Sequence, residues 1–316
     1  MVIESIFLIN VSPPNSNRIF GALAIFCVPI LYGGFYISTI IAMTEISVFW
    51  LGTFRMIVAL LAFIPFYNHL KCISKQDLLV NLGLGVIFLI GYIAQSFGLK
   101  TVSAGMGGFL AALFIILTPI FKRLIFKNKI SNWYIIPILI SFVGYYWLFK
   151  PTGSDSIIIG IGEILSIIGA VTIALHMVIT EHYVSDRDPF VYAILQTMVI
   201  FIGSLLFALI FDFDIFTLEI SLKVWLFIIY LGIGTTVITF VLQSYGQKYV
   251  NAVLAAIIIA LEPVFATIFG MIFGNESIGT NFIIGGSLIL FSAIIAILFQ
   301  FQNRKEKNTS EQTDNN

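Results

Sequence analysis

Long apolar segments separated by short polar ones dominate the pattern along this chain of 316 residues. Ten of the segments approach the length of about 20 residues that a helix needs to cross roughly 30 Å of hydrocarbon. The predicted spans are 19–41, 46–67, 77–99, 103–121, 132–149, 157–180, 189–211, 222–245, 251–273 and 279–300. No stretch between them is long enough to form a soluble domain. The pattern predicts an all-α polytopic membrane protein whose functional site lies inside the helix bundle.

Composition supports this class and argues against an enzyme. The chain is 59% hydrophobic and only 10% charged, whereas a soluble domain carries about 25% charged residues. The sequence contains no HExxH, no GxSxG, no phosphate-binding loop and no paired-cysteine spacing, so the common hydrolase, nucleotide and metal motifs are missing. We therefore expect no enzymatic activity, no cofactor and no bound metal.

The charges are balanced, with 16 basic and 16 acidic residues. A net charge of zero gives no information about nucleic acid or acidic partners, whereas the placement of the charges is informative. We expect no nucleic-acid partner. The expected partners are a small-molecule solute and the lipid bilayer. A homodimer is the open alternative to a monomer.

The placement of the basic residues predicts the orientation in the membrane. If the N-terminus is cytoplasmic, the outer loops contain only Lys100, Lys150 and Lys223, and Arg55 lies inside a span. The other twelve of the sixteen basic residues fall on the cytoplasmic side. The positive-inside rule thus supports ten spans with both termini cytoplasmic. We expect a multi-pass protein of the cell (inner) membrane.

One phrase of the sequence occurs twice. QSFGLKTVSAG at 95–105 returns as QSYGQKYVNA at 243–252, and each copy joins the third span of a five-span half to the fourth. Because five is odd, Lys100 falls outside the membrane and Lys248 inside, so the halves run in opposite directions. The sequence therefore predicts two inverted-topology five-helix repeats.

The repeat divides the chain into four parts. We expect a cytoplasmic leader at 1–18, a first repeat of helices 1 to 5 at 19–150, and a second repeat of helices 6 to 10 at 157–300. The polar tail at 301–316 has a composition typical of disorder.

Two prolines are expected to kink their helices. Thr118-Pro119 in the fourth span corresponds to Glu262-Pro263 in the ninth, although the spacing from the repeated phrase differs by four residues, about one helical turn. Proline lacks the backbone N–H that continues a helix, so Pro119 and Pro263 are predicted kink sites. A membrane tolerates such kinks where neighbours or a cavity satisfy the freed carbonyl.

The order of these pieces resembles a known family. QSFGLKTVSAG leads to LTP in the first half, and FVLQSYGQKYVNA leads to LEPVFA in the second. Two further pieces are FRMIVALL, which contains Arg55 in the second span, and ALHMVITEHY, which closes the sixth. Over residues 19–300 the chain resembles the drug/metabolite transporter superfamily, specifically its EamA-like branch. The resemblance implies a secondary transporter of small organic solutes, with helices 1 to 4 and 6 to 9 around a central cavity and helices 5 and 10 peripheral.

Arg55 and His176 are the first candidates for contact with a solute. Arg55 lies well inside the second span, where a charge costs about 2.5–3.5 kcal/mol and needs a partner; a substrate carboxylate and a structural ion pair fit equally. His176 shares one helix face with Gly169, Thr172 and Thr180. Such a stripe is typical of a cavity wall or of a closely packed face of small residues.

The remaining substrate-binding candidates are aromatic and amide residues that can wall and anchor an amphipathic solute. They are Tyr32, Tyr92, Gln95, Gln196 and Gln243. Glu262, in the ninth span, is the candidate for proton coupling, because an acid in the bundle interior can bind and release a proton. The alternative, which we favour, is that Glu262 hydrogen-bonds backbone freed by Pro263.

The sequence thus predicts a secondary transporter that moves a small organic metabolite by alternating access. We expect an amino acid or a related compound, moved by export. One alternative is uptake or exchange of a nucleoside-like or cofactor metabolite such as an adenosyl compound. An alternative of another class is a non-transporting membrane scaffold or a channel.

Overall fold

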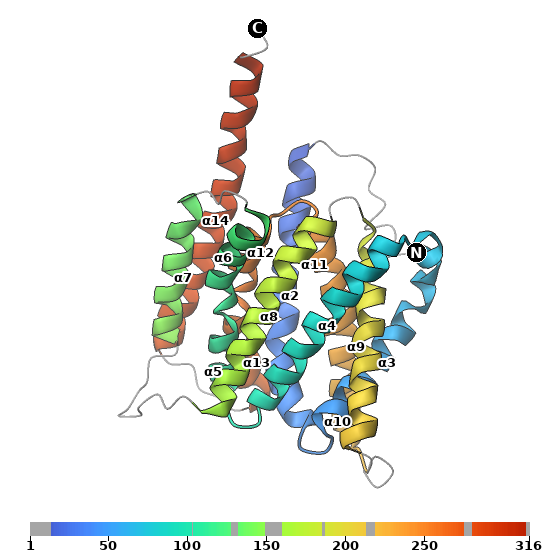
Figure 1. The fold of residues 1–316 in the computed structure, drawn as a ribbon. Coiled ribbons are helices and arrows are strands. Elements are labelled where there is room, and N and C mark those ends of the chain that lie inside the picture. Colours follow the sequence, from blue (N-terminus) through green and yellow to red (C-terminus); the bar gives the residue numbers. More distant parts are fainter. Residues whose placement is uncertain are drawn as a thin grey trace.

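The structure is a computed structural model that describes residues 14–102, 104–127, 132–148, 160–184, 187–212, 219–274 and 280–313. Every regular element in these ranges is a helix (Figure 1). Seven of the described helical segments are long and apolar enough to cross a membrane. These features fit the predicted class, an integral multi-pass membrane protein. Most of the predicted leader, 1–13, lies outside the described residues.

The first half contains three long helices and several shorter elements. They are α2 (Pro14–Ala42), α3 (Val48–Phe63), η1 (Ile64–Cys72, 3₁₀), α4 (Lys75–Gly98), α5 (Ala104–Ala111), α6 (Phe114–Phe126), η2 (Asn132–Tyr134, 3₁₀) and α7 (Ile135–Leu148). Helix α4 begins with a capping box in which Ser74 and Asp77 satisfy each other's backbone N–H groups. This cap explains the sharp start of the helix after a polar loop.

The second half is arranged in a similar way. It contains α8 (Ile161–Val184), α9 (Pro189–Phe211), α10 (Leu222–Gly232), η4 (Ile233–Ile238, a π-helix), α11 (Thr239–Gln247), α12 (Ala252–Ile259), α13 (Glu262–Gly274) and α14 (Thr280–Thr313). The predicted span 222–245 is therefore one path of three segments. Its central π-helical turn widens the helix and changes which backbone groups are paired.

The fourth and ninth predicted spans are each broken into two helices. The break between α5 and α6 lies at Ala112 and Leu113, and the break between α12 and α13 lies at Ala260 and Leu261. At each break the second residue donates to the carbonyl three positions earlier, at 3.2 Å, in place of the usual four. A continuous apolar sequence covers both breaks, so hydropathy alone predicts unbroken spans there.

The two prolines relate differently to these breaks. Pro263 is the second residue of α13 and follows its break directly, a position where a missing N–H costs nothing. Pro119 is the sixth residue of α6 and therefore lies inside the helix, between one and two turns beyond the first break. The hydroxyl of Thr118 there donates to the Phe114 carbonyl at 2.6 Å. The structure thus places a break beside Pro263, whereas α6 continues through Pro119.

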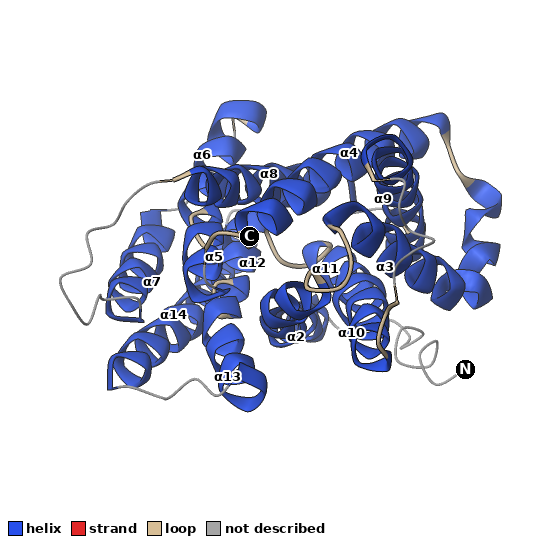
Figure 2. Cartoon of the chain, turned by 90° about the horizontal axis from the view of Figure 1, so that it is seen from below, coloured by secondary structure: helices blue, strands red, loops and turns tan. Residues whose placement is uncertain are grey.

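The long helices pack in pairs that recur across the two halves. Helix α2 packs against α11 and α13, and α8 packs against α4 and α6. Helices α3 and α9 pack together, and α7 and α14 lie against each other at one edge of the bundle (Figure 2). The start of α2 and the end of α14 point to the same side of the bundle (Figure 1).

Helices in a membrane associate through close packing of small residues, because apolar side chains gain no hydrophobic stabilisation when they move from lipid to another helix. A Cβ atom at Gly98 of α4 would lie 2.9 Å from the carbonyl oxygen of Gly162 in α8. A Cβ atom at Gly246 of α11 would lie 2.9 Å from the carbonyl oxygen of Gly21 in α2. Gly98 and Gly246 are the glycine that the two copies of the repeated phrase share, so the phrase marks two equivalent helix contacts.

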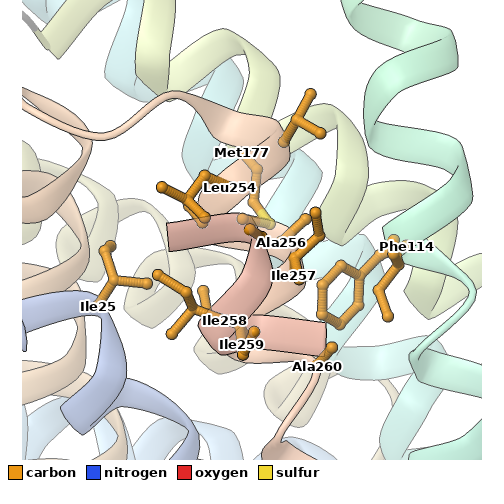
Figure 3. Close-up of a cluster of buried hydrophobic side chains, with 14 of the residues drawn as sticks. Ile25, Phe114, Met177, Leu254, Ala256, Ile257, Ile258, Ile259 and Ala260 are labelled. Carbon is orange, nitrogen blue, oxygen red and sulfur yellow. The ribbon is translucent and has the colours of Figure 1, made fainter. Parts of the chain in front are cut away.

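Helix α12 is the most deeply buried element. Its eight residues are all buried, and they pack with Ile25 of α2, Phe114 of α6 and Met177 of α8 (Figure 3). Tyr145 of α7 donates to the Ala260 carbonyl at the end of this helix. The hydroxyl of Tyr145 therefore satisfies a backbone group that the helix break leaves free.

Helix α14 is longer than the predicted span 279–300. Its backbone stays helical through Thr313 and takes in most of the polar tail for which we expected disorder. The tail residues NRKEK include Arg, Lys and Glu, which have good helix propensity and can extend a helix that the preceding apolar segment has already nucleated.

Candidate functional site

A cavity of about 700 Å³, including the space at its mouth, lies between helices of both halves. It is lined by Tyr32, Phe35, Tyr36, Arg55, Phe88, Gly91, Tyr92, Gln95, Thr172, Ile173, His176, Met177, Gln243, Ile259 and Glu262. These residues come from α2, α3, α4, α8, α11, α12 and α13, and none comes from the described parts of α7 or α14. A largely apolar wall with a few polar groups is typical of a site for a small organic ligand.

Arg55 on α3 is held against the π-helical turn. Its Nε donates to Thr236 Oγ1 at 2.7 Å, and its Nη2 donates to the Thr235 carbonyl at 2.9 Å. The Thr236 hydroxyl donates in turn to the Leu231 carbonyl, five residues earlier, at 2.9 Å. The Thr235 carbonyl that accepts from the guanidinium group thus belongs to the π-helical turn, and such bulges are frequent at functional sites.

Aromatic rings complete the surroundings of Arg55. Its guanidinium carbon lies 5.2 Å from the ring centre of Phe35 and 5.5 Å from that of Tyr92, within the range of cation–π attraction. Arg55 is 1% exposed, and its Nη1 has no hydrogen-bond acceptor among the described residues. Among the described residues, moreover, no carboxylate forms an ion pair with the Arg55 guanidinium group. The guanidinium charge is stabilised by a hydroxyl group, a backbone carbonyl and two aromatic rings. Its Nη1 has no acceptor among the described residues.

Glu262 lies at the cavity where α13 begins. It is the first residue of α13 and is 8% exposed, so its carboxyl group is near the free N–H groups of a helix start, where an acidic group is favoured. The Tyr36 side chain of α2 forms a hydrogen bond with it. The break before Pro263 therefore places an acid at the cavity wall and at a helix N-terminus together.

His176 connects the cavity to a buried polar chain. Its Nε2 lies 2.7 Å from Gln196 Oε1, and Gln196 Nε2 donates to Asn81 Oδ1 at 3.1 Å. Asn81 Nδ2 donates to the Asp77 carbonyl at 2.8 Å. Phe88 packs edge-on against the imidazole, with ring centres 5.4 Å apart. The histidine is thus a fixed part of the cavity wall.

Comparison with known proteins decides the class of the protein. A family model described as the EamA-like transporter family matches residues 19–150 and 160–298. The chain belongs to the EamA-like transporter family. It is 28% identical over 282 residues to an uncharacterized transporter of Archaeoglobus fulgidus, covering 89% of this chain and 87% of the relative. The family and this relative are consistent with the resemblance to the drug/metabolite transporter superfamily and identify a transporter, not an enzyme.

Two further similarities agree with this assignment. An uncharacterized transporter of Clostridium kluyveri is 24% identical over 254 residues, covering 76% of this chain and 79% of that one. A solved crystal structure matches with a TM-score of 0.72 at 17% identity, covering 88% of this chain and 96% of the other. The latter similarity supports the fold alone.

The structure of this EamA-like transporter gathers most of the predicted site residues. Six of the seven substrate-binding candidates line the cavity, as does the proton-coupling candidate Glu262. The six are Tyr32, Arg55, Tyr92, Gln95, His176 and Gln243. Gln196 lies behind His176 and contacts it directly, while Pro119 and Pro263 are not part of the lining. Whether these residues bind a solute stays a prediction.

Several residues of the site were not anticipated from the sequence. Asn81, 0% exposed, and Thr236, also 0% exposed, contact candidate residues from other helices. Phe35 and Phe88 lie against Arg55 and His176. Asn81 is a lone amide near the start of an apolar span, and that isolation was a usable signal; the phenylalanines are indistinguishable in sequence from lipid-facing ones.

Proposed function

We propose that this EamA-like transporter carries a small metabolite with a carboxylate group, an amino acid or a related compound, by alternating access. The observation that carries the proposal is Arg55: a buried guanidinium group at the cavity wall, with no ion-pair partner in the described chain and with Nη1 free of any acceptor. A buried charged donor without an acceptor is costly. A solute carboxylate supplies the missing acceptor and the missing charge.

The opposite charge at the same cavity favours a zwitterion. Glu262 lines the cavity that Arg55 lines, so an ammonium group and a carboxylate on one molecule can each meet an opposite charge. The rings of Tyr32, Phe35 and Tyr36 line the same cavity and offer an apolar surface to a side chain. Charge separation in a mostly apolar site supports an amino acid over a simple anion.

We further propose that ten membrane spans form two inverted five-helix repeats, at 19–150 and 157–300. Adding 148 to the residue number takes Gln95 to Gln243 and the break at Ala112 to the break at Ala260. Backbone hydrogen bonds support the same register. The Gly98 carbonyl accepts from Thr101 and Val102, and the Gly246 carbonyl accepts from Tyr249 and Val250, all at 2.9–3.0 Å.

The opposed directions of the two copies support alternating access. Helix α4 and the path from α10 to α11 end on opposite sides of the bundle (Figure 1), as inverted repeats require. In such carriers the two halves exchange conformations around a site near the middle. The proposal of cytoplasmic termini rests on the positive-inside rule. Location in the cell (inner) membrane and export are what we expect of a carrier of this family.

The test is uptake into proteoliposomes that contain the purified full-length protein. Labelled amino acids and adenosyl metabolites are supplied with and without a pH gradient. We expect saturable uptake of an amino acid that its unlabelled form competes, and loss of that uptake in Arg55→Met. Saturable uptake of adenosyl compounds alone, or of amino acids at equal rates in Arg55→Met, would contradict the proposal.

A matched control distinguishes the loss of Arg55 itself from the loss of one positive charge anywhere in the protein. Arg123 of α6 is exposed and does not line the cavity, so Arg123→Met removes one arginine away from the site. We expect uptake by Arg123→Met to equal that of the unaltered protein. Size-exclusion profiles of both variants check that the protein is folded.

A further inference from the structure

A chain of hydrogen bonds runs through three helices from a backbone carbonyl to the cavity. It begins at the Asp77 carbonyl, passes through Asn81 of α4 and Gln196 of α9, and ends at His176 of α8. The three side chains are 0%, 2% and 5% exposed, respectively. Buried polar groups of this kind are normally satisfied, so each bond constrains the next.

The first bond fixes the direction of the whole chain. The Asp77 carbonyl can only accept, so Asn81 must direct its amide NH₂ toward it and its Oδ1 toward Gln196. Gln196 must then donate from its NH₂ to that oxygen, which turns its own Oε1 toward His176. Reversing either amide would bring two oxygens together. The Gln196 oxygen therefore faces Nε2 of the imidazole, which must carry the proton.

The imidazole is uncharged in this setting. In the described chain no carboxylate forms an ion pair with His176. Its nearest ring neighbours are Phe88 and Phe240. A buried charge without a partner is far more costly than a neutral ring. A neutral imidazole with a proton on Nε2 has an unprotonated Nδ1, which is a hydrogen-bond acceptor.

We infer that His176 is held in the Nε2–H tautomer and presents Nδ1 as an acceptor for an N–H donor of the solute. The side chain lines the cavity. Its Nδ1 has no partner among the described residues and is not one of their fully buried unbonded atoms, so it is open to a ligand. Asn81 and Gln196 act as positioning residues, since they set the tautomer without lining the cavity.

This inference adds a specificity determinant to the proposed function. The contact between His176 and a solute rests on that proposed function, whereas the tautomer of His176 does not. With Arg55 as donor to a carboxylate and His176 as acceptor from an amine, the cavity recognises an amino acid by both of its polar groups. A 2-oxo acid with the same side chain has the carboxylate but lacks the N–H donor. A site built to pair an N–H group discriminates strongly against a ligand that lacks it.

The tautomer can be measured without any solute. The chain has three histidines, His69, His176 and His182, so ¹⁵N NMR of the ¹⁵N-histidine-labelled full-length protein can be assigned with one variant, His176→Gln. We expect a protonated Nε2 and an unprotonated Nδ1 for His176 at neutral pH. In Asn81→Leu, which removes the anchor of the chain, we expect a mixture of tautomers. An Nδ1–H tautomer or an imidazolium in the unaltered protein would overturn the inference.

Binding of L-phenylalanine and phenylpyruvate then tests the contact with a solute. An asparagine at position 176 can place an oxygen where Nδ1 lies, whereas a glutamine reaches the position of Nε2. We expect at least a tenfold preference for the amino acid in the unaltered protein, most of it kept in His176→Asn and lost in His176→Gln. Equal preferences in His176→Gln and the unaltered protein would remove His176 from recognition.

The two measurements separate the inference from the proposed function. If neither compound binds the unaltered protein and no other amino acid does, the amino-acid assignment fails, and the tautomer alone decides whether His176 presents an acceptor. If the amino acid binds but the tautomer is the wrong one, the proposed function survives and the inference fails.

Discussion

The Arg55 Nε atom donates a 2.7 Å hydrogen bond to Thr236 Oγ1, and this bond joins α3 in the first half to the π-helical turn in the second. Neither residue is more than 1% exposed. The bond holds a cation at the cavity wall without neutralising it, because a hydroxyl group and a carbonyl group bear no net charge. The site thereby keeps a positive charge available for a ligand.

We predict that Thr236→Val lowers both stability and solute affinity. The change leaves Arg55 Nε without its acceptor, and loss of a buried hydrogen bond to a charged group costs about 1.5–3 kcal/mol. The unfolding temperature of the purified protein and the half-saturation concentration for uptake measure the two effects.

Thr267→Val is the matched control, because Thr267 bonds only within its own helix, to the Pro263 carbonyl at 2.9 Å. Both variants lose a hydroxyl group that donates to a helix carbonyl. We expect Thr267→Val to shift neither quantity by more than a small fraction of the Thr236→Val effect. Equal shifts would mean that the contact with Arg55 contributes little.

The glycines of the repeated phrase should both resist substitution. A Cβ at Gly98 or at Gly246 would lie 2.9 Å from a backbone oxygen of the neighbouring helix, so one helix must move, at a cost of about 1–3 kcal/mol. We expect Gly98→Ala and Gly246→Ala each to lower the unfolding temperature and the uptake rate.

Gly83 of α4 provides the control for these two variants. A Cβ there meets nothing within 4 Å, and alanine favours a helix interior over glycine by about 0.5–1 kcal/mol. Gly83→Ala is therefore expected to be neutral or slightly stabilising. If it destabilised the protein as much as Gly98→Ala does, helix contact would not explain the losses.

The Lys122–Glu181 ion pair is predicted to stabilise the contact between the C-terminal ends of α6 and α8. Lys122 Nζ of α6 lies 2.6 Å from Glu181 Oε1 of α8, and Glu181 Oε2 also accepts from the Ala252 N–H at the start of α12, at 3.0 Å. The pair is partly exposed, so its own contribution is about 1 kcal/mol or less. The charge swap Lys122→Glu with Glu181→Lys should restore only part of the stability lost in Glu181→Lys alone.

The incomplete rescue follows from the second role of Glu181. A lysine cannot accept a hydrogen bond, so the Ala252 N–H loses its side-chain cap in the swapped protein. The unfolding temperatures of the two single variants and of the swapped protein show how much stability the ion pair and the cap each contribute. Full recovery in the swap would show that the ion pair, and not the cap, is the significant contact.

Glu262→Gln is predicted to uncouple transport from the pH gradient. Glutamine keeps the size and the hydrogen-bonding capacity of the carboxyl group beside Tyr36 but cannot exchange a proton. We expect exchange of labelled for unlabelled solute to continue, while the effect of a pH gradient on uptake disappears. An unchanged response to the gradient would assign Glu262 the structural role at the start of α13.

Some of these features could be predicted from sequence, and others depend on tertiary contacts. Apolar length located each long helix, because the bilayer sets that length. The breaks before Phe114 and Glu262 were hidden, since both lie inside continuous apolar runs. The π-helical turn was hidden as well, because Arg55, from another helix, supplies its partner.

The candidate site divides in the same way. Polar residues in apolar spans, such as Arg55 and His176, stand out because membranes penalise them. Their surroundings do not stand out: Asn81 matters because it reaches Gln196, 115 positions away, and Phe35 matters because it lies over Arg55. Sequence spacing within one helix contains no information about either contact.

Counterflow distinguishes a carrier with a carboxylate site at Arg55 from a protein that only lets the solute equilibrate. Proteoliposomes loaded with an unlabelled amino acid are diluted into a trace of the labelled form. We expect transient accumulation of label above its equilibrium level, with a half-saturation concentration at least tenfold higher in Arg55→Lys and unchanged in Arg123→Lys. Simple equilibration of the label without an overshoot would rule out a carrier, and equal half-saturation concentrations in both variants would rule out a carboxylate site at Arg55.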